Sequence, residues 1–186
     1  MGEALLIIDF QNDFTPGGAL PVAHGDEIAD HVNELARSGR FDVVVATRDW
    51  HPADHWSFEA HGGPWPVHCV QGTPGAEFHP ALDRAPVDLV IDTGITPDKA
   101  GYSAFEDTDL ETILRDRGID RVTVVGLATD YCVRASALDA LGAGFEVTVD
   151  PDGVRGVDVN PGDSEHALEE IRRAGGTVGR PADVGS

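Results

Sequence analysis

Acidic and imidazole side chains follow a run of β-branched residues in the stretch VVVATRDWHPADHWSF, residues 43–58. Asp49 and His51 share one side of the chain if the extended geometry continues past the strand, because side chains alternate along it. Mixed carboxylate and imidazole ligation suits Zn, Mn or Fe and leaves open positions for water or substrate. The alternative is a polar loop in which these groups only cap and hydrogen-bond. A later histidine could complete a metal site by loop closure: His55, His61, His68 or His79.

The thiol of Cys132 is the second chemical candidate, in the stretch GLATDYCVRASALDAL. It falls at the start of a predicted helix, where unpaired N–H groups and the helix dipole favour a thiolate and can hold an oxyanion. Thr129 or Asp130 could cap this helix. Asp9 ends the first predicted strand and could act as the base if the fold places it beside the thiol. The alternatives are a packed small side chain for Cys132 and a structural acid for Asp9.

Short apolar runs alternate with segments of helical period, and this alternation is typical of a parallel sheet with crossover helices. We therefore predict one α/β domain over residues 1–186, with a doubly wound, mostly parallel sheet of five or six strands and helices on both faces. In such folds, ligands bind beyond the carboxyl ends of the strands. The predicted strands are 4–9, 43–47, 88–92, 122–126 and 145–149, and the helical periodicity covers 28–36, 110–114, 133–141 and 168–171.

Residues 50–87 interrupt this alternation with repeated Pro and Gly, five of the eight histidines and all three tryptophans. A connection of this length in a compact domain is usually functional. No GxGxxG motif follows the first strand and no GxxxxGK[ST] motif occurs, which disfavours dinucleotide and P-loop phosphate binding.

The formal net charge is −20, with 33 acidic residues against 13 basic ones. Such a surface repels nucleic acid and anionic membranes, so we expect neither as a partner. No run approaches the roughly 20 apolar residues that a membrane span requires, and the N-terminus has no basic region before its short apolar run. We expect a soluble cytoplasmic protein.

Five stretches, in order from residue 4 to about residue 150, carry a resemblance to a known family: LLIIDFQNDFTPGGAL, VVATRDWHPADHWSF, WPVHCVQGTPGAEFHPAL, GYSAFE and VVGLATDYCVRASALDAL. Together they resemble the nicotinamidase/pyrazinamidase branch of the isochorismatase-like cysteine hydrolases. The resemblance implies a small-molecule amide substrate and one divalent transition metal ion that orients it, and it leaves a homo-oligomer open. It implies that Asp9 is the general base and Cys132 the nucleophile. The implied metal ligands are Asp49, His51 and His68, with His55 at a position that ligates the metal in some members.

The same resemblance implies which residues form the walls of a substrate pocket. Phe14, Trp65 and Tyr102 match positions that surround a pyridine ring in the family, and stacking against a flat heteroaromatic suits them. By residue type alone, Phe14 and Tyr102 could equally fill the core. The resemblance further implies a cis peptide at Leu127–Ala128, with the N–H groups of Ala128 and Cys132 as oxyanion donors.

One position departs from the family pattern. The family has a catalytic lysine after its third strand, and Thr93 stands at the matching position in VIDTGITPDKAGYSAF. The only lysine of the chain is Lys99, six residues further on. Losing a cation near Asp9 raises the pKa of that carboxylate. Three hypotheses follow: a nicotinamidase that also accepts pyrazinamide and acts through a Cys132 thioester, a related hydrolase for another small amide or ureido compound, and a catalytically impaired paralogue.

Overall fold

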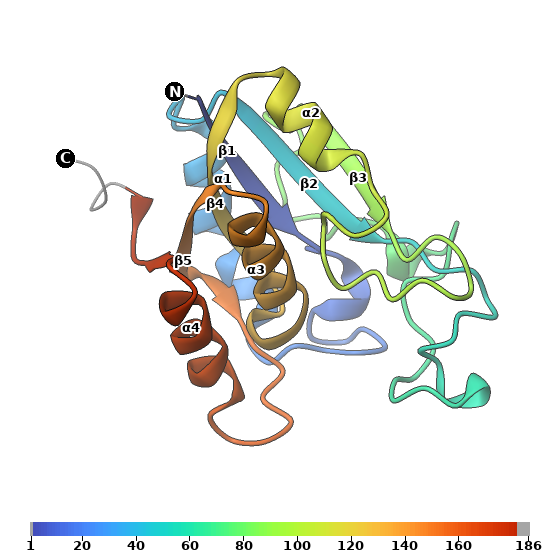
Figure 1. Cartoon of the computed structure of the whole chain (residues 1–186). Helices are drawn as coiled ribbons and strands as arrows, with labels where there is room; N and C mark the ends of the chain where they lie inside the picture. Colours follow the sequence, from blue (N-terminus) through green and yellow to red (C-terminus); the bar gives the residue numbers. More distant parts are fainter. Residues whose placement is uncertain (1, 182–186) are drawn as a thin grey trace.

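Six parallel strands form a single sheet in the order β3-β2-β1-β4-β5-β6 in the computed structural model, which describes residues 2–181 (Figure 1). The doubly wound prediction is therefore confirmed, and the sixth strand is a two-residue edge segment that the sequence pattern did not locate. The strands are β1 (Gly2–Ile8), β2 (Val43–Asp49), β3 (Leu89–Thr93), β4 (Ile119–Leu127), β5 (Glu146–Arg155) and β6 (Thr177–Val178).

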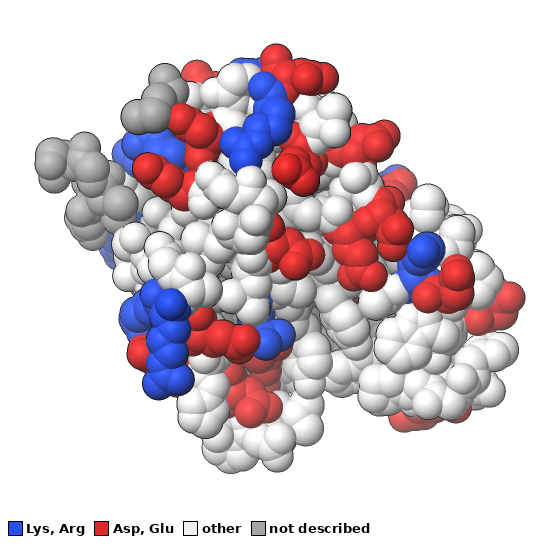
Figure 2. All heavy atoms as spheres, viewed as in Figure 1, with Lys and Arg blue, Asp and Glu red and all other residues white. Residues whose placement is uncertain are grey.

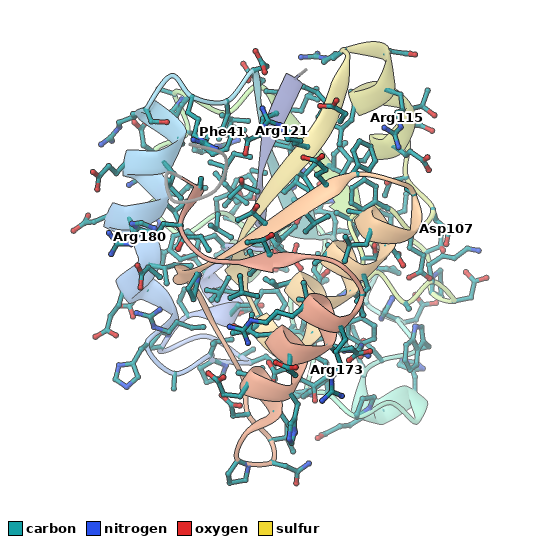
Figure 3. All side chains as sticks on the ribbon, turned by 60° about the vertical axis from the view of Figure 1, so that its left-hand side comes forward. Phe41, Asp107, Arg115, Arg121, Arg173 and Arg180 are labelled. Atoms are coloured by element: carbon teal, nitrogen blue, oxygen red, sulfur yellow. The ribbon has the colours of Figure 1, made fainter. Side chains whose placement is uncertain are left out.

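Helices cover both faces of the sheet. Leu5 and Ile7 of β1 pack in the core on the α1 side, whereas Leu6 and Ile8 pack on the side of α2, α3 and α4. Because both faces are buried, the central strands are apolar almost throughout. Figure 3 shows α1 on one side of the sheet and α3 and α4 on the other. The helices are α1 (Ala29–Arg37), α2 (Leu110–Asp116), α3 (Arg134–Gly142) and α4 (Asp163–Arg173).

Strand β5 extends further than its apolar run predicts. The pattern favoured residues 145–149, but pairing with β4 resumes at Val154 after an irregularity in the ladder. Pro151 and Gly153 lie in this irregular part, and both residues are typical of interrupted strands. A pattern based on apolar residues ends at such a break, although the strand continues beyond it.

The carboxyl ends of the strands bring the candidate residues to one edge of the sheet. Asp9 follows β1, Asp49 ends β2 and Thr93 ends β3, and the parallel register pairs Asp49 directly with Thr93. The segment between β2 and β3 contains only short 3-10 turns, at Glu59–His61 and Pro74–Ala76, and lies over this edge. The predicted long connection therefore contributes to the site.

Acidic side chains are spread over the face shown in Figure 2, with basic side chains at only a few places. Several of the arginines are paired with acids; Arg134, for example, donates to both carboxylate oxygens of Glu170 at 2.7 Å. Within residues 2–181, no helix has both the length and the apolar composition that crossing a bilayer requires.

Candidate active site

Asp9 stands immediately after β1 in an uncommon backbone conformation. Its φ is 49°, in the left-handed region that non-glycine residues rarely occupy, and its side chain is almost fully buried. The hydroxyl of Thr47 donates to Asp9 Oδ1 at 2.8 Å. Backbone strain of this kind persists where the surrounding structure enforces it and is concentrated at functional sites.

Cys132 lies beside this carboxylate. Its Sγ and one oxygen each of Asp9 and Asp49 all lie within 4.8 Å of one another, and all three residues are buried. Burial first, and then the charge of Asp49, raises the pKa of Asp9 well above its usual value. Burial and the charges of Asp9 and Asp49 likewise raise the pKa of the Cys132 thiol. Burial thus disfavours the charged form of both groups, and it makes the ionised Asp9 a stronger base than an exposed aspartate.

Cys132 lies in a wide turn between β4 and α3. The Leu127–Ala128 peptide is cis, as the resemblance implies, and Thr129–Val133 form a π-type turn before α3 begins. The N–H groups of Tyr131 and Val133 both donate to the carbonyl of Ala128 at 3.1 Å. Cys132 thus precedes the helix by two residues.

The expected helix cap is not formed, so that prediction is wrong. Neither Thr129 nor Asp130 caps the turn with its side chain. The Asp130 carboxylate instead accepts hydrogen bonds from the N–H groups of Val157 and Asp158, at 2.9 and 2.8 Å. These two backbone donors satisfy both oxygens of the Asp130 carboxylate, whereas a helix cap would satisfy only one oxygen. The spacing of residues in the sequence does not reveal that this loop lies beside Asp130.

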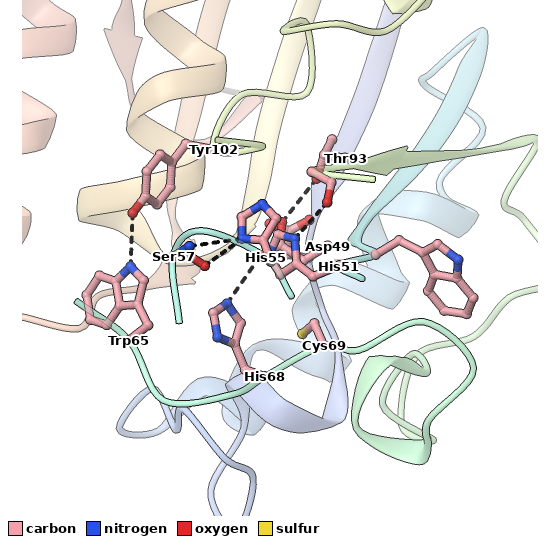
Figure 4. A network of polar contacts seen from close by, with 12 residues as sticks. Asp49, His51, His55, Ser57, Trp65, His68, Cys69, Thr93 and Tyr102 are labelled. Carbon is pink, nitrogen blue, oxygen red and sulfur yellow. Dashed lines mark hydrogen bonds and ion pairs between the residues drawn. The ribbon is translucent and has the colours of Figure 1, made fainter. Parts of the chain in front are cut away.

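Asp49, His51 and His68 form a cluster whose ligand atoms lie within 4.8 Å of one another (Figure 4). Nδ1 of His51 is 2.9 Å from the Gly94 carbonyl and Nδ1 of His68 is 2.8 Å from the Pro66 carbonyl. A carbonyl only accepts, so each Nδ1 carries a proton, and in the neutral imidazole each Nε2 has a free lone pair. These Nε2 atoms face Asp49 Oδ2 at 3.2 and 3.9 Å.

Two lone pairs directed at one carboxylate oxygen repel one another unless a proton or a cation lies between them. Burial alone would raise the pKa of Asp49, but the charge and hydrogen bond of His51, with smaller effects of His68 and Thr93, hold it below its usual value. Burial lowers the pKa of His68, whereas for His51 burial is outweighed by the charge and hydrogen bond of Asp49, which raise the pKa. A bound cation takes the place of the proton between His51 and Asp49. An ionised carboxylate and a neutral imidazole are the forms that ligate metals. The donor set therefore fits a divalent transition metal ion.

The other histidines of the long connection are oriented differently. His55 stacks on His51 with ring centroids 3.9 Å apart. Its Nδ1 is paired with the Ser57 hydroxyl, and its Nε2 with the carbonyl of Lys99. Both ring nitrogens of His55 are thus directed away from Asp49. His61 is exposed, and His79 lies against Phe10.

Aromatic side chains line a pocket of about 370 Å³, counting the part open to solvent, that reaches Cys132. All three predicted wall residues, Phe14, Trp65 and Tyr102, border it. The indole N–H of Trp65 donates to the Tyr102 hydroxyl at 2.9 Å. The sequence analysis assigned no wall role to four further residues of the lining: Leu20, Leu127, Tyr131 and Val157. The first three lie inside the quoted motifs, which was the available signal, whereas Val157 lies outside them.

Gln11 is a second residue that the sequence analysis left without a role. It is fully buried, and its Nε2 donates to the carbonyls of Asp49 and Ala76 at 2.8 Å each. Its Oε1 accepts from the Asp49 N–H at 2.9 Å. Gln11 thus fixes the backbone of a candidate metal ligand. Its place two residues after Asp9, inside a quoted motif, was the available signal.

Replacing Gln11 with Leu should lower the free energy of unfolding by about 3 kcal/mol, because three buried backbone groups lose their partner. Denaturant unfolding measures this change. Gln71→Leu is the matched control, since Gln71 is exposed and donates to two carbonyls that water can reach. Equal losses in the two variants would contradict the structural role of Gln11.

Thr93 and Lys99 lie in different surroundings. The Thr93 hydroxyl donates to Asp49 Oδ1 at 3.0 Å. The Lys99 ammonium is 3.6 Å from Asp107 Oδ1, and 46% of its side chain is exposed. Among residues 2–181, no ion pair joins a lysine or arginine to Asp9 or Asp49. The ammonium that the family pattern places near Asp9 is therefore not replaced by Lys99.

Comparisons with known proteins agree with this architecture. Residues 3–183 match the family described as isochorismatase domain. The nicotinamidase of Escherichia coli (strain K12) is 43% identical over 97% of this chain and 96% of its own. Pyrazinamidase of Pyrococcus horikoshii, solved in complex with zinc, is 52% identical with a TM-score of 0.88, over 96% of this chain and 98% of its own. PnC1 from L. infantum, solved in complex with nicotinate, is 37% identical with a TM-score of 0.92, over 97% of this chain and 93% of its own. The chain therefore belongs to the isochorismatase domain family.

Proposed function

We propose that this protein is a metal-assisted cysteine amidohydrolase that converts nicotinamide and water to nicotinate and ammonia, and that it also accepts pyrazinamide. One observation carries the proposal. Cys132 lines a pocket with several aromatic walls together with Asp49 and His68, and the buried carboxylate of Asp9 has an oxygen within 4.8 Å of its Sγ. A flat heteroaromatic amide matches such walls, and the similarity to a nicotinamidase and a pyrazinamidase supports the same substrate class.

Asp9 and Cys132 carry the covalent chemistry in this proposal. Asp9 takes the proton of the thiol, and the sulfur attacks the amide carbon to form a C–S bond. The carbonyl π electrons move to oxygen, and the N–H groups of Ala128 and Cys132 stabilise the resulting oxyanion. Asp9 then returns the proton to the departing nitrogen as the C–N bond breaks, which releases ammonia and leaves a thioester.

Water completes the turnover. Asp9, again ionised, takes a proton from the water that attacks the thioester; as the C–S bond breaks, Asp9 returns this proton to the departing sulfur, which gives the carboxylic acid and the free thiol. The burial of Asp9 makes it a stronger base than an exposed aspartate, which favours both proton transfers.

Asp49, His51 and His68 would hold a Zn, Mn or Fe ion, which would supply a Lewis acid for the ring nitrogen and so help to orient the amide. We keep His55 outside this ligand set because both of its nitrogens are engaged elsewhere. Phe14, Trp65 and Tyr102 enclose the ring and limit the access of water to it.

Purified protein with Zn²⁺ or Mn²⁺ should release ammonia from nicotinamide, and a chelator should lower the rate at least about tenfold in a manner that added metal reverses. Benzamide is the matched control, because it has the same shape but lacks the ring nitrogen. We expect benzamide to be hydrolysed far more slowly. Failure to release ammonia from nicotinamide or pyrazinamide at any metal loading would contradict the proposal.

Thr93 favours one second candidate, a catalytically impaired paralogue that binds the amide without turning it over. The same assay separates the two candidates. An impaired paralogue binds nicotinamide, as measured by calorimetry, and releases no ammonia. Thr93→Lys then restores turnover by returning the missing ammonium. A hydrolase for a different small amide or ureido compound binds nicotinamide weakly and stays without activity on it in either form.

A further inference from the structure

Two buried carboxylates lie side by side and have different roles in the proposed function. Asp9 and Asp49 each place an oxygen within 4.8 Å of the other and of Cys132. One must exchange protons and the other must hold a cation. Two carboxylates in one site repel each other, which disfavours the ionised form of each. A hydrogen-bond donor to each carboxylate stabilises its ionised form and holds it in one orientation.

Threonine hydroxyls from neighbouring strands supply these donors. Thr47 donates to Asp9 Oδ1 at 2.8 Å, and Thr93 donates to Asp49 Oδ1 at 3.0 Å. The second contact follows from the sheet register, which pairs Asp49 of β2 with Thr93 of β3. Paired residues of adjacent parallel strands point to the same face about 5 Å apart, so the hydroxyl reaches the carboxylate without distortion.

The bond from Thr93 leaves the second oxygen of Asp49 for the imidazoles. Oδ1 is held by the hydroxyl, whereas Oδ2 faces Nε2 of His51 at 3.2 Å and Nε2 of His68 at 3.9 Å (Figure 4). Asp49 therefore presents a single oxygen to the centre of the cluster. This is the arrangement of a one-oxygen ligand in a tetrahedral or five-coordinate site.

The end of β3 orients a second ligand in the same way. The carbonyl of Gly94, the next residue after Thr93, accepts the Nδ1–H of His51. Gly94 has a φ of +59°, and a Cβ there would collide with the His51 ring, so only glycine fits. Thr93 and Gly94 thus hydrogen-bond two of the three candidate ligands, Asp49 and His51, through atoms that do not face the centre of the cluster.

We propose that Thr93 is a positioning residue for the metal: its hydroxyl fixes Asp49 as a one-oxygen ligand, at a position where the family pattern has a catalytic lysine. The inference rests on the metal site of the proposed function. In this role Thr93 orients the metal ligand Asp49. Its position is then more than a site at which the catalytic ammonium of the family has been lost. Outer hydrogen bonds of this kind commonly change metal affinity by roughly 10- to 100-fold.

Zinc affinity of the full chain, measured without substrate by competition with a chromophoric chelator, tests this role. Thr93→Val keeps the shape of the side chain and removes the donor, and it should weaken Zn²⁺ binding roughly 10- to 100-fold. Thr93→Ser keeps the hydroxyl and should bind within about threefold of the parent chain. Thr123→Val is the matched control, because Thr123 is also buried and donates to a carboxylate, that of Glu3, at the far end of β1 from Asp9.

The visible spectrum of the Co²⁺-loaded protein gives a second measurement. Its band positions depend on the coordination of the ion and do not change when a variant is only less stable. Freeing Asp49 Oδ1 permits a second oxygen to approach the ion, so Thr93→Val should shift the ligand-field bands toward those of a higher coordination number. Thr93→Ser and Thr123→Val should leave the bands unchanged. Circular dichroism of each variant establishes that it is folded.

Several results would overturn the role of Thr93: unchanged zinc affinity and cobalt spectrum in Thr93→Val, an equal loss in Thr93→Ser, an equal loss in Thr123→Val, or a parent chain that binds no zinc. None of them depends on amide hydrolysis. A parent chain that binds no zinc would remove the zinc site from both proposals. Each of the other results overturns only the role of Thr93, and the ammonia assay tests the proposed reaction separately.

Discussion

Cys132→Ala should reduce nicotinamide hydrolysis by at least about 10⁴-fold while leaving the zinc content of the protein unchanged. We expect a large loss because, in the proposed mechanism, the sulfur forms the covalent bond to the substrate, and alanine has no nucleophile. The metal cluster does not use this thiol, since its three ligands come from β2 and from the long connection after it. Ammonia release and metal analysis of the same preparation measure the two outcomes.

Cys69→Ala is the matched control for this prediction. Cys69 is the only other cysteine of the chain and is also buried. It does not line the pocket, and burial raises the pKa of its thiol well above the usual value. We expect Cys69→Ala to keep the activity within a few-fold. Retained turnover in Cys132→Ala, or abolished turnover in Cys69→Ala alone, would exclude Cys132 as the nucleophile.

Asp9→Asn should lower kcat by roughly 10²- to 10⁴-fold, because an amide cannot take the proton of the thiol. Burial is the largest cause of the raised pKa of Cys132, and burial and the charge of Asp49 remain in this variant while the contribution of Asp9 is lost. The thiol therefore stays protonated and has no neighbouring base to take its proton. The rate of Cys132 alkylation by iodoacetamide should fall in parallel with kcat. A variant that loses turnover but keeps the alkylation rate would assign Asp9 to a later step.

The control for Asp9→Asn is Asp150→Asn. Asp150 is likewise fully buried, and its carboxylate pairs with His31 at 2.7 Å, outside the pocket. This variant removes a buried charge and is expected to lose stability without losing the alkylation rate of Cys132. Thermal unfolding of both variants separates loss of stability from loss of the base. Equal losses of alkylation rate in the two variants would count against a specific role for Asp9.

The reactive residue types and the strands that carry them could be predicted from the sequence. Apolar runs such as ALLIID identify strands buried on both faces, and Asp9 and Asp49 follow from where those runs end. This information is local, because burial on both faces produces an uninterrupted apolar run. The roles of Cys132, Asp49 and His68 depended on the resemblance of five ordered motifs, since a spacing between single residues is compatible with many folds.

Which side chains touch was decided by the tertiary structure alone. The sequence placed Thr93 at a lysine position beside Asp9, whereas the β2–β3 register places its hydroxyl on Asp49, 44 residues away. Gln11 likewise reaches Asp49 from another strand end. Register between strands is set by how whole faces pack, and a shift of one residue would turn each side chain to the opposite face. A one-dimensional pattern identifies the groups available, but only packing selects the partner of each.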